Sequence, residues 1–509
     1  MKAKDLLKDI EILEIRGSFN EDQEITDVCF HSNKVKDGAI FVAIKGHETD
    51  GHKYINDAIK RGAAIIFVED FQDVDTCQIK VANGRIALAD LSDNFFDHPS
   101  TKLNVIGITA TNGKTTTSFM VEKIFQEAGI KTGVSGTVDV RYGDVSIPSI
   151  LTTPESRDLQ EHTKNMVDLG ISDLIMEVSS HAQEMYRVKN MDYDIVTFNN
   201  LSREHIDQHG SFENYAKIKS RLIRNAKEDA YVILNFDEDY IKKLANETKG
   251  KVLSYSFKNK DQDFGIDNLD FSTGYPRYDF VINRDIEELK LKKGSFPVDL
   301  GIAGYSSVMN SVAAIIISLV RGIDIPTIQK ALRDFNGVER RFQVIYDEDF
   351  MIIDDHYANA RNINVTMETI SMMAYKNFHI FYAIRGNRGV NLNRESAEES
   401  AKWLKKLGVN EIYSTSSAET VTWKDEVSKE EKEVFDEVMK ENGIKVIHFD
   451  RLDDACYHVL ETVEKGDLLL LAGCQGMDPA GRIVLEKLTE NVDPKKKEEL
   501  MKVLDGRAF

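Results

Sequence analysis

The chain has 509 residues, of which 42% are hydrophobic, and its formal net charge is −20. This length predicts about three domains, and the acidic balance argues against a nucleic acid bound through its phosphates. Four widely spaced cysteines fit neither a disulfide framework nor a zinc site, and no apolar run is long enough to span a bilayer. The first residues lack an apolar signal core, so we expect a cytoplasmic protein without a membrane partner.

Residues 1–100 predict a small α/β domain. The turn signal Asp37-Gly38 is followed by a strand-like run over 39–44, a helix near 54–61 and a second strand over 63–68. No linker rich in proline or serine follows, so we expect the domain joints to be short loops.

Residues 101–338 begin with a loop between a strand and a helix. The apolar run 103–108 leads into Gly-Ile-Thr-Ala-Thr-Asn-Gly-Lys-Thr-Thr-Thr at 107–117, and apolar residues recur at helical spacing over 118–128. Such a loop directs backbone N–H groups and a helix N-terminus at an anion. The context therefore indicates a phosphate-binding loop.

The residue types in this loop are those that a nucleoside triphosphate requires. Lys114 can reach the β- and γ-phosphates, and the Thr115 hydroxyl can bind Mg²⁺. Five residues separate Gly107 from Gly113, whereas the Walker pattern has four. We predict a nucleoside triphosphate site; the alternative is an ordinary glycine turn.

Three further apolar runs, at 174–177, 195–198 and 231–234, alternate with helical segments and predict a mostly parallel sheet. Glu177 ends the first of them. Ligands of open α/β sheets lie at the carboxyl ends of the strands, so this carboxylate can reach a Mg²⁺ ion held by Thr115. A structural cap is the alternative for Glu177.

The loop after the second run gathers two acids and two imidazoles: Glu204, His205, Asp207 and His209. Imidazole suits proton transfer or metal contact near neutral pH, although a polar surface loop would look similar. Lys217 and Lys219 follow in a predicted helix. Either lysine could be a phosphate ligand, a modified base or an exposed helix residue.

Two other segments suggest substrate contacts. The hydroxyls of Thr152 and Thr153 precede a helix and could hold a substrate phosphate, or the segment could be a helix cap with proline. Asn310, near the start of a later helix, could contact a base edge or cap the helix.

Residues 339–509 form another α/β series, with strands predicted at 350–353, 378–384, 411–413, 445–449 and 467–472. Arg340 and Arg341 begin it. Arginine suits the charge that develops in phosphoryl transfer, although a solvated surface pair is the alternative. The charged run 424–440 is typical of a solvated helix face.

Several long motifs, in order, resemble the Mur ligases, the ATP-dependent amino-acid ligases of peptidoglycan precursor synthesis, and most closely the tripeptide synthetases that add the third residue. The resemblance covers nearly the whole chain. The stretches that carry it are 108–117, Thr152-Thr-Pro-Glu155, Glu177-Val-Ser-Ser-His-Ala182 and 200–210, with 32–38, 41–46 and 50–52 in the first domain.

The resemblance implies three α/β domains: a UDP-substrate-binding domain over 1–100, a central P-loop domain over 101–338 with a mostly parallel sheet, and a Rossmann-like ligase domain over 339–509. It also implies the reaction. ATP phosphorylates a substrate carboxylate, an amine attacks the acyl phosphate, and an amide, ADP and phosphate result. The implied substrates are UDP-N-acetylmuramoyl-L-alanyl-D-glutamate and an amino acid, with ATP and Mg²⁺ as cofactors and a monomer favoured.

By the same resemblance, residues can be assigned to ligands one by one. The implied catalytic residues are Lys114, Glu177, His205 and Lys219, the last as a carbamate, and Thr115, Glu177, His205 and Lys219 are the implied metal ligands. The nucleotide would contact Thr111, Asn112, Gly113, Lys114, Thr115, Thr116, Asn310, Arg341 and Asp354. The UDP-sugar substrate would contact Ser32, Thr152, Thr153, Ser179 and Arg187.

The chain departs from the family pattern where the amine should bind. An Asp-Asn-Pro-Arg signature is replaced by the segment 414–420, and Gly-Lys-Gly-His-Glu is replaced by 473–478. Met185 stands where a substrate-binding glutamine is common, and 354–359 departs from the usual Asp-Tyr-Ala-His. A ligase that acts on another carboxylate and amine is therefore a second hypothesis, and a non-catalytic nucleotide-binding regulator is a third.

Overall fold

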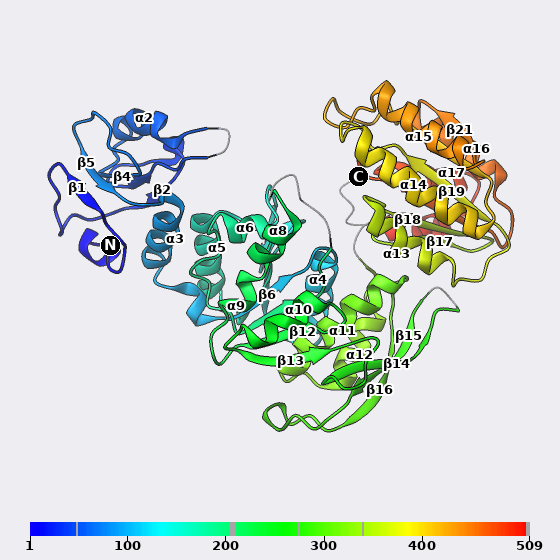
Figure 1. Ribbon diagram of the computed structural model, residues 1–509, viewed down its shortest axis with the longest axis horizontal. Helices are drawn as coiled ribbons and strands as arrows, with labels where there is room; N and C mark the ends of the chain where they lie inside the picture. The colour runs from blue at the N-terminus through cyan, green and yellow to red at the C-terminus, as the bar shows by residue number, and fades with distance from the viewer. Residues whose placement is uncertain (47–48, 203–209, 273–274, 338–339, 505–509) are drawn as a thin grey trace. The chain divides into compact units, whose positions relative to one another are not determined.

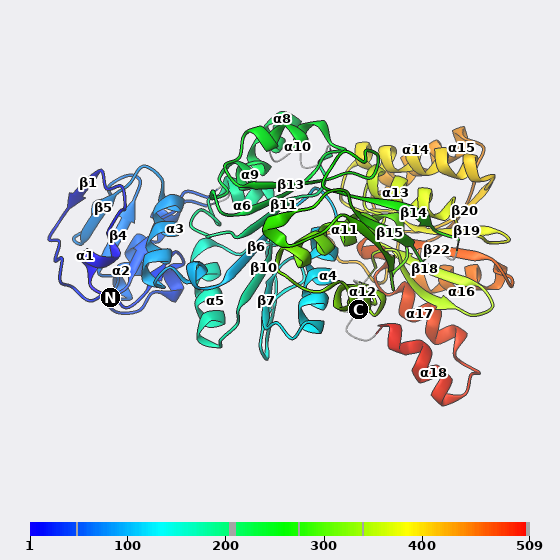
Figure 2. The ribbon, with the colours of Figure 1, turned by 90° about the horizontal axis from the view of Figure 1, so that it is seen from below.

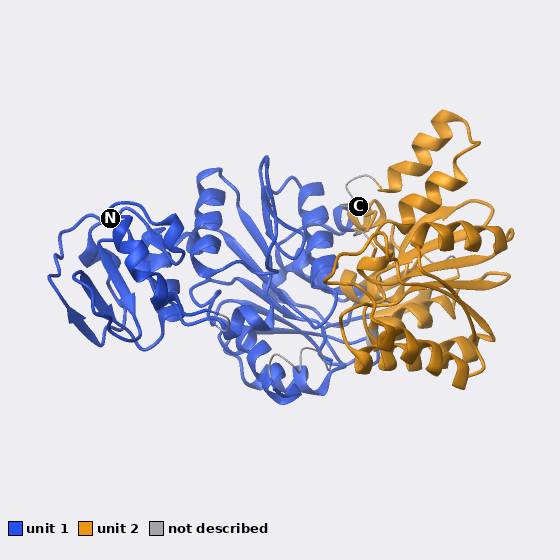
Figure 3. Cartoon of the chain, turned by 90° about the horizontal axis from the view of Figure 1, so that it is seen from above, with its two compact units in different colours: residues 1–265, 281–294, 312–328 blue, residues 266–280, 295–311, 329–509 orange. Residues whose placement is uncertain are grey.

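The computed structural model describes residues 1–46, 49–202, 210–272, 275–337 and 340–504. They form two compact units, one of residues 1–265, 281–294 and 312–328 and one of residues 266–280, 295–311 and 329–509 (Figure 3). No helix among these described residues is long and apolar enough to cross a membrane. His205 and its neighbours at 203–209 lie outside the described residues.

The N-terminal part of the first unit is a five-stranded sheet with an apolar core on each face. Its strand order is β1-β5-β4-β3-β2, and the β1–β5 pair is antiparallel while the others are parallel. The bounds are β1 Glu14–Arg16, β2 Val28–Cys29, β3 Ile40–Val42, β4 Ile65–Val68 and β5 Cys77–Lys80, with helices α1 Ala3–Leu6, α2 Ile55–Lys60 and α3 Gly84–Phe95.

The central sheet has the order β16-β15-β14-β13-β12-β11-β6-β10-β7-β8-β9, and Figure 1 shows β14, β15 and β16 side by side. Its middle strands are parallel and almost wholly buried, because helices cover both faces of such a sheet. The strands are β6 Asn104–Thr109, β7 Thr132–Ser135, β8 Asp139–Tyr142, β9 Val145–Pro148, β10 Asp173–Glu177, β11 Ile195–Phe198, β12 Tyr231–Asn235, β13 Lys251–Tyr255, β14 Phe264–Asp270, β15 Arg277–Ile282 and β16 Gly294–Asp299.

Helices alternate with these strands along the chain, as a parallel sheet requires. They are α4 Lys114–Glu127, α5 Ser156–Asp168, α6 Ser180–Glu184, α8 Phe212–Lys219, α9 Arg221–Arg224, α10 Asp239–Lys243, α11 Tyr305–Val320 and α12 Ile325–Arg333. The aspartate at the start of β10 is fully buried, and the Arg321 side chain neutralises it: Arg321 Nε donates to Asp173 Oδ1 at 2.6 Å.

The second unit contains a six-stranded sheet of order β17-β18-β22-β19-β20-β21, in which β17 is the one antiparallel strand among those described. Alternate residues of its strands point to opposite faces. Ile353, Ile380 and Leu470 join one apolar cluster with α13, α14 and α15, and Ile352, Phe381 and Leu471 join another with α16 and α17 (Figure 2).

The elements of this sheet have the following bounds. The strands are β17 Gln343–Asp347, β18 Met351–Asp355, β19 Phe378–Ala383, β20 Glu411–Thr415, β21 Lys445–Phe449 and β22 Leu468–Ala472, and the helices are α13 Ala360–Ile370, α14 Val390–Leu407, α15 Lys429–Glu441, α16 Leu452–Thr462, α17 Ala480–Leu488 and α18 Pro494–Met501.

The predicted α/β class is confirmed, and most predicted strands lie within two residues of the observed ones. One expectation needed correction. The helix after the phosphate loop begins at Lys114, four residues before the predicted start, because the loop closes directly into its first turn. The charged residues in 424–440 include an exposed face of α15, as predicted, and the other face of the helix buries Val434, Phe435 and Val438.

Candidate active site

The glycine loop joins β6 to α4 and folds back on itself. Gly113 has a φ of +87°, a left-handed conformation that costs glycine little because it has no Cβ. Lys114 then begins α4, and its Nζ donates to the backbone oxygens of Ala110 at 3.0 Å and Thr111 at 3.1 Å. The ammonium group therefore lies over the loop, beside the N–H groups of the helix N-terminus, where an anion is favoured.

A second segment, which follows β11, holds this loop in place. Asn200 accepts a hydrogen bond from the Asn112 N–H at 3.0 Å and donates to the Asn112 oxygen at 2.9 Å. The Thr111 hydroxyl accepts from the Ser202 N–H at 2.9 Å and lies 3.2 Å from the Tyr215 hydroxyl. The loop shape is thus set by partners about 90 residues away in the sequence.

Glu177 lies at the carboxyl end of β10, next to the loop. The Thr115 hydroxyl donates to its Oε2 at 3.0 Å, and Thr137 donates to both oxygens, from its N–H at 2.8 Å and its hydroxyl at 3.0 Å. The carboxylate is fully buried, so these donors replace its lost hydration. A Cβ on Gly136 would collide with Glu177 Oε1, which explains a glycine there.

The predicted substrate hydroxyls occupy different environments. Thr152 lies 3.3 Å from the Thr137 hydroxyl, whereas Thr153 is fully buried and its hydroxyl donates to the Glu177 backbone oxygen at 2.8 Å. Ser179 caps α6 by accepting from the Ala182 N–H at 3.1 Å. The Thr153 hydroxyl therefore links the segment before α5 to the end of β10.

Arg187 links these segments to a carboxylate. Its guanidinium lies 2.9 Å from Glu155 Oε1 and donates to the Thr153 oxygen at 3.3 Å. Burial lowers the pKa of Arg187, and the nearby Glu155 opposes that shift. The arginine is buried and charged, and one of its nitrogens, Nε, has no partner among the described residues.

A cavity of about 380 Å³ lies between the phosphate loop and the predicted substrate residues. It is lined by Lys114, Leu151, Thr152, Ser179, Ser180, His181, Arg187, Tyr215 and Lys219. Lys219 is only 2% exposed, and its Nζ lies 5.2 Å from the centre of the Tyr215 ring. Three of the lining side chains, those of Lys114, Arg187 and Lys219, are cationic, so the cavity suits an anionic ligand.

The donors around Glu177 also fit a hard divalent cation. Hydroxyl and carboxylate oxygens are the ligands that Mg²⁺ takes, with substrate phosphates and water completing its shell. Thr115 and Glu177 supply two such oxygens, whereas no cluster of three His, Cys, Asp or Glu side chains occurs among the described residues. An ion with few protein ligands fits this arrangement better than zinc.

Other predicted residues lie elsewhere. Ser32 lines a separate cavity of about 570 Å³, together with His31, Asn33, Arg85 and Glu155. Thr116 is buried in the first turn of α4. Asn310, Arg341 and Asp354 belong to the second compact unit.

In that unit, the neighbouring arginines differ sharply. Arg341 is exposed, but Arg340 is 4% exposed, with its Nε donating to Asp354 Oδ1 at 3.0 Å. Arg340 also donates to Asp478 and to the backbone oxygens of Gly473 and Cys474. It is therefore not part of a solvated surface pair; it anchors one of the two altered segments.

The structure brings the two altered segments together within the second unit. The Ser417 hydroxyl donates to the Gly476 oxygen at 2.6 Å. Ser417 has a φ of +50° and is fully buried, so this turn is held by its surroundings. The residues at 414–420 and 473–478 thus lie together at the carboxyl ends of β20 and β22.

Sequence reasoning missed several residues of the site: Gly136, Thr137, Asn200 and Tyr215. Thr137 follows β7, a strand that was not predicted, and only the parallel pairing of β7 with β10 brings it to Glu177. A Gly-Thr pair directly after a short run of small and β-branched residues was the available signal.

A strand, a left-handed glycine, a helix that starts on Lys-Thr and a carboxylate at the next strand end define a P-loop nucleotide-binding domain. The family comparisons agree with it. The Mur ligase middle domain matches residues 108–318, the catalytic domain of the Mur ligase family matches 24–96, and the Mur ligase glutamate ligase domain matches 340–475.

Relatives match over nearly the full length. The UDP-N-acetylmuramoyl-L-alanyl-D-glutamate–2,6-diaminopimelate ligase of Caldanaerobacter subterraneus is 32% identical over 476 residues, which cover 93% of this chain and 94% of that protein. The same ligase from Clostridium botulinum is 35% identical over 342 residues, 66% of this chain and 68% of that protein.

Solved structures share the fold. A diaminopimelate ligase of that type has a TM-score of 0.68 at 22% identity, covering 93% of both chains. The MurF ligase from Thermotoga maritima in complex with ADP has a TM-score of 0.63 at 20% identity, covering 94% of this chain and 98% of the other. The chain belongs to the Mur ligase family and is an ATP-dependent ligase with that family's three-domain architecture.

Proposed function

We propose that this ligase joins an amino acid to UDP-N-acetylmuramoyl-L-alanyl-D-glutamate through an acyl phosphate, releasing ADP and phosphate. The proposal rests on one cavity, in which Lys114 and Lys219 lie with Thr152, Ser179 and Arg187. Groups suited to phosphates thus border groups suited to a carboxylate substrate, as transfer between the two requires. The named substrate of the relatives supports the same carboxylate.

In this proposal, the chain's own residues bind and orient the reactants. Lys114 and the N–H groups of α4 hold the transferring phosphate, Arg187 and Ser179 hold the UDP-sugar substrate, and Ser32 contacts it from its separate cavity. A bound Mg²⁺ ion, held by Thr115, Glu177, His205 and a carbamate on Lys219, would neutralise phosphate charge. Asn310, Arg341 and Asp354 are proposed to contact the nucleotide from the second unit. We further propose that the enzyme acts as a monomer in the cytoplasm.

A second candidate function is supported by the segment that is expected to bind the amine. Asp478, the acidic residue of the altered segment 473–478, is already paired with Arg340. A carboxylate paired in this way is not available to hold an ammonium group on the incoming amino acid, which supports an amine different from that of the relatives. A ligase acting on another carboxylate and amine, outside peptidoglycan synthesis, is therefore the second candidate.

The test is to incubate the protein with ATP, Mg²⁺, UDP-N-acetylmuramoyl-L-alanyl-D-glutamate and a panel of amino acids, and to detect a new amide by mass. We expect one amino acid to be joined. ADP release with other carboxylates but none with this substrate would support the second candidate. ATP binding without turnover of any substrate would instead favour a nucleotide-binding regulator.

Lys114→Ala is expected to lower the rate of amide formation by about 10²- to 10³-fold, because it removes a cation from the phosphate site. Lys123→Ala, a half-exposed lysine on the same helix, is the matched control and should keep the rate. Steady-state ADP release measures both. Undiminished activity in Lys114→Ala would contradict the assignment of the loop.

A further inference from the structure

One carboxylate, that of Glu155, lies between the two cavities that the proposed reaction uses. Glu155 lines the cavity of about 570 Å³ that also contains Ser32. Its oxygens pair with two arginines: Oε1 lies 2.9 Å from Arg187 Nη2, and Oε2 accepts from Arg85 Nη1 at 3.3 Å. Arg187 lines the active-site cavity, and Arg85 lines the other one. The carboxylate therefore connects cationic groups of both cavities.

The place of Glu155 in its helix does not explain why a glutamate stands there. Glu155 is the N-cap residue of α5, but its side chain forms no capping hydrogen bond. N-caps are usually serine, threonine, aspartate or asparagine, whose short side chains reach the first N–H groups of the helix. The longer glutamate side chain instead pairs with the two arginines and is only 17% exposed. Its contacts thus serve the cavities rather than the helix start.

Arg187 depends on this carboxylate as its counter-ion. The arginine side chain is 7% exposed. Burial lowers the pKa of Arg187, Glu155 opposes this shift, and the nearby Arg85 adds to it. Removing one partner of a buried ion pair leaves an uncompensated charge. Without Glu155, burial and the repulsion from Arg85 would act on Arg187 unopposed, so we expect its guanidinium to move from its present place.

The backbones that carry the two arginines are held independently of Glu155. Asn83 caps α3 by accepting from the Arg85 N–H at 2.9 Å. The Arg187 N–H donates to the Ala182 oxygen at 3.0 Å. Loss of the carboxylate would therefore release the guanidinium groups and leave these backbone positions in place.

A separate ion pair joins α5 to the N-terminal sheet. Arg157 of α5 donates from Nη2 to Asp27 Oδ1 at 2.9 Å and from Nε to the Val28 oxygen of β2 at 3.1 Å. Arg157 is not among the described residues that line either cavity. The attachment of α5 to β2 therefore has a support that a change at Glu155 does not remove.

The three side chains together carry one positive charge. Arg85 is the one permanently charged cation among the described residues that line its cavity, where Asp57 and Glu155 are acidic. In the active-site cavity, Arg187 lies with two lysines. An anionic substrate that reaches both cavities thus meets a guanidinium in each. Because both groups are already oriented, binding costs less ordering free energy.

We propose that Glu155 is a positioning residue, which holds the guanidinium groups of Arg85 and Arg187 where one anionic substrate accepts hydrogen bonds from both. This inference rests on the proposed function, in which UDP-N-acetylmuramoyl-L-alanyl-D-glutamate reaches both cavities. The diphosphate of that substrate is the anion expected at Arg85, because phosphate oxygens match the planar guanidinium. Glu155 acts through the arginines, which occupy both of its oxygens.

Isothermal titration calorimetry of the full-length protein with UDP-N-acetylmuramoyl-L-alanyl-D-glutamate, in the presence of a non-hydrolysable ATP analogue and Mg²⁺, tests the inference. Glu155→Gln should weaken binding about 10- to 100-fold, the contribution of a hydrogen bond to a charged group. Glu155→Asp keeps the charge but is one methylene shorter, so it cannot reach both arginines and should weaken binding too. Unchanged or stronger binding in Glu155→Gln, with unchanged binding in Glu155→Asp, would overturn the inference.

Two controls separate this role from a general loss of structure. The dissociation constant of the ATP analogue should stay the same in both variants, because the phosphate loop does not contact Glu155. Glu161→Ala removes an ion pair with Arg157 on the same helix and lines neither cavity among the described residues, so it should keep the affinity for the UDP substrate. A parallel loss of ATP-analogue binding in the Glu155 variants would contradict a positioning role.

A double-mutant cycle tests whether Glu155 acts through its partner. Arg187→Ala should weaken binding of the UDP substrate, and adding Glu155→Gln should then cost no more than about threefold, because only Arg85 is left to position. An equal loss in both backgrounds would overturn the inference. If the unchanged protein does not bind this substrate, the proposed function fails and the inference with it; binding that all Glu155 variants retain overturns the inference alone.

Discussion

At Gly136, a single added methyl group would disturb the buried Glu177 carboxylate directly. The new Cβ would meet Glu177 Oε1, a fully buried atom that accepts the Thr137 N–H at 2.8 Å. The carboxylate cannot move without leaving that donor unsatisfied, and Gly136 directly follows β7. Overpacking at such a position costs about 1–3 kcal/mol.

We therefore expect Gly136→Ala to lower kcat and to raise the Mg²⁺ concentration needed for half-maximal rate. The physical cause is displacement of a carboxylate that lies beside the Thr115 hydroxyl. Gly294→Ala is the control, because Gly294 has no atom within 4 Å of the added Cβ. An unchanged Mg²⁺ dependence in Gly136→Ala would show that Glu177 does not act through the metal.

His356, in the second unit, couples stability to pH. Burial lowers its pKa to about 2, and the guanidinium groups of Arg341, Arg340 and Arg385 add to the effect. Above about pH 6.5, its ordinary pKa, the ring is neutral in both the folded and the unfolded chain. Below that pH, the unfolded chain binds a proton that the folded chain does not, so the free energy of unfolding falls as the pH falls.

This loss amounts to about 1.4 kcal/mol per pH unit, or about 2 kcal/mol between pH 6.5 and pH 5. We expect His356→Gln to show a correspondingly shallower pH dependence. Urea unfolding followed by tryptophan fluorescence measures it, since both tryptophans of the chain, Trp403 and Trp423, lie in the second unit. Parallel stability profiles for the two proteins would contradict the prediction.

Among the elements, α14 and α15 depend on one carboxylate. Glu431 forms a capping box with Ser428 at the start of α15. Its two oxygens accept backbone N–H groups from Asn387 at 3.1 Å, Arg388 at 2.8 Å, Gly389 at 2.7 Å and Ser428 at 2.9 Å. Burial raises the pKa of Glu431, but these four donors outweigh it and the pKa is lowered overall.

Glu431→Ala should therefore destabilise the second unit by about 1–3 kcal/mol, because it removes the shared acceptor of N–H groups at two helix starts. Glu430→Ala, at the exposed neighbour, should change stability little. Urea midpoints for the two variants give the comparison. Equal midpoints would mean that the loop before α14 finds other acceptors.

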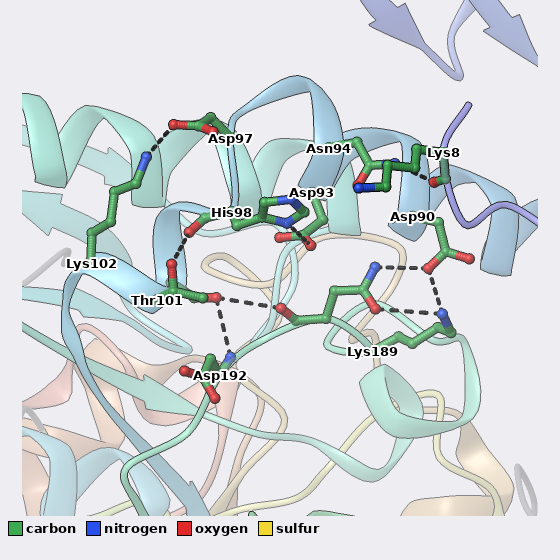
Figure 4. Close-up of polar contacts among 12 residues, drawn as sticks. Lys8, Asp90, Asp93, Asn94, Asp97, His98, Thr101, Lys102, Lys189 and Asp192 are labelled. Atoms are coloured by element: carbon green, nitrogen blue, oxygen red, sulfur yellow. Dashed lines mark hydrogen bonds and ion pairs between the residues drawn. The ribbon is translucent and has the colours of Figure 1, made fainter. Parts of the chain in front are cut away.

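At the scale of the whole molecule, a polar network ties α3 to the central part of the first unit (Figure 4). Asp90 accepts from Lys189 and from Asn190 at 2.8 Å, and the Ser100 hydroxyl donates to the Asn190 oxygen at 3.4 Å. Asp90 has a side-chain exposure of 16%, so solvent screens this network less than a surface pair.

Asp90→Ala should accordingly speed trypsin cleavage after Lys102, in the connection that follows α3. Without the Asp90 contacts, local unfolding of this connection costs less free energy. Mass analysis of timed digests measures the cut. Asp168→Ala is the control, since Asp168 pairs with Lys164 one turn away on α5 and joins no separate segments. Equal cleavage in the two variants would show that the network does not limit opening.

Much of this protein could be predicted from local patterns. The glycine loop, the strand before it and Glu177 at the next strand end follow from spacing alone, because helix and strand periods and loop chemistry are properties of adjacent residues. The α/β class and about half of the strand positions were predicted for the same reason. The resemblance to Mur ligases rests on these same ordered motifs.

Tertiary structure decided what distant residues do to one another. The parallel register of β7 against β10 brings Thr137 to Glu177, and Arg340 and Arg341, adjacent in sequence, have opposite environments. Register, burial and unsatisfied donors depend on contacts between segments far apart in sequence, and local patterns do not determine those contacts.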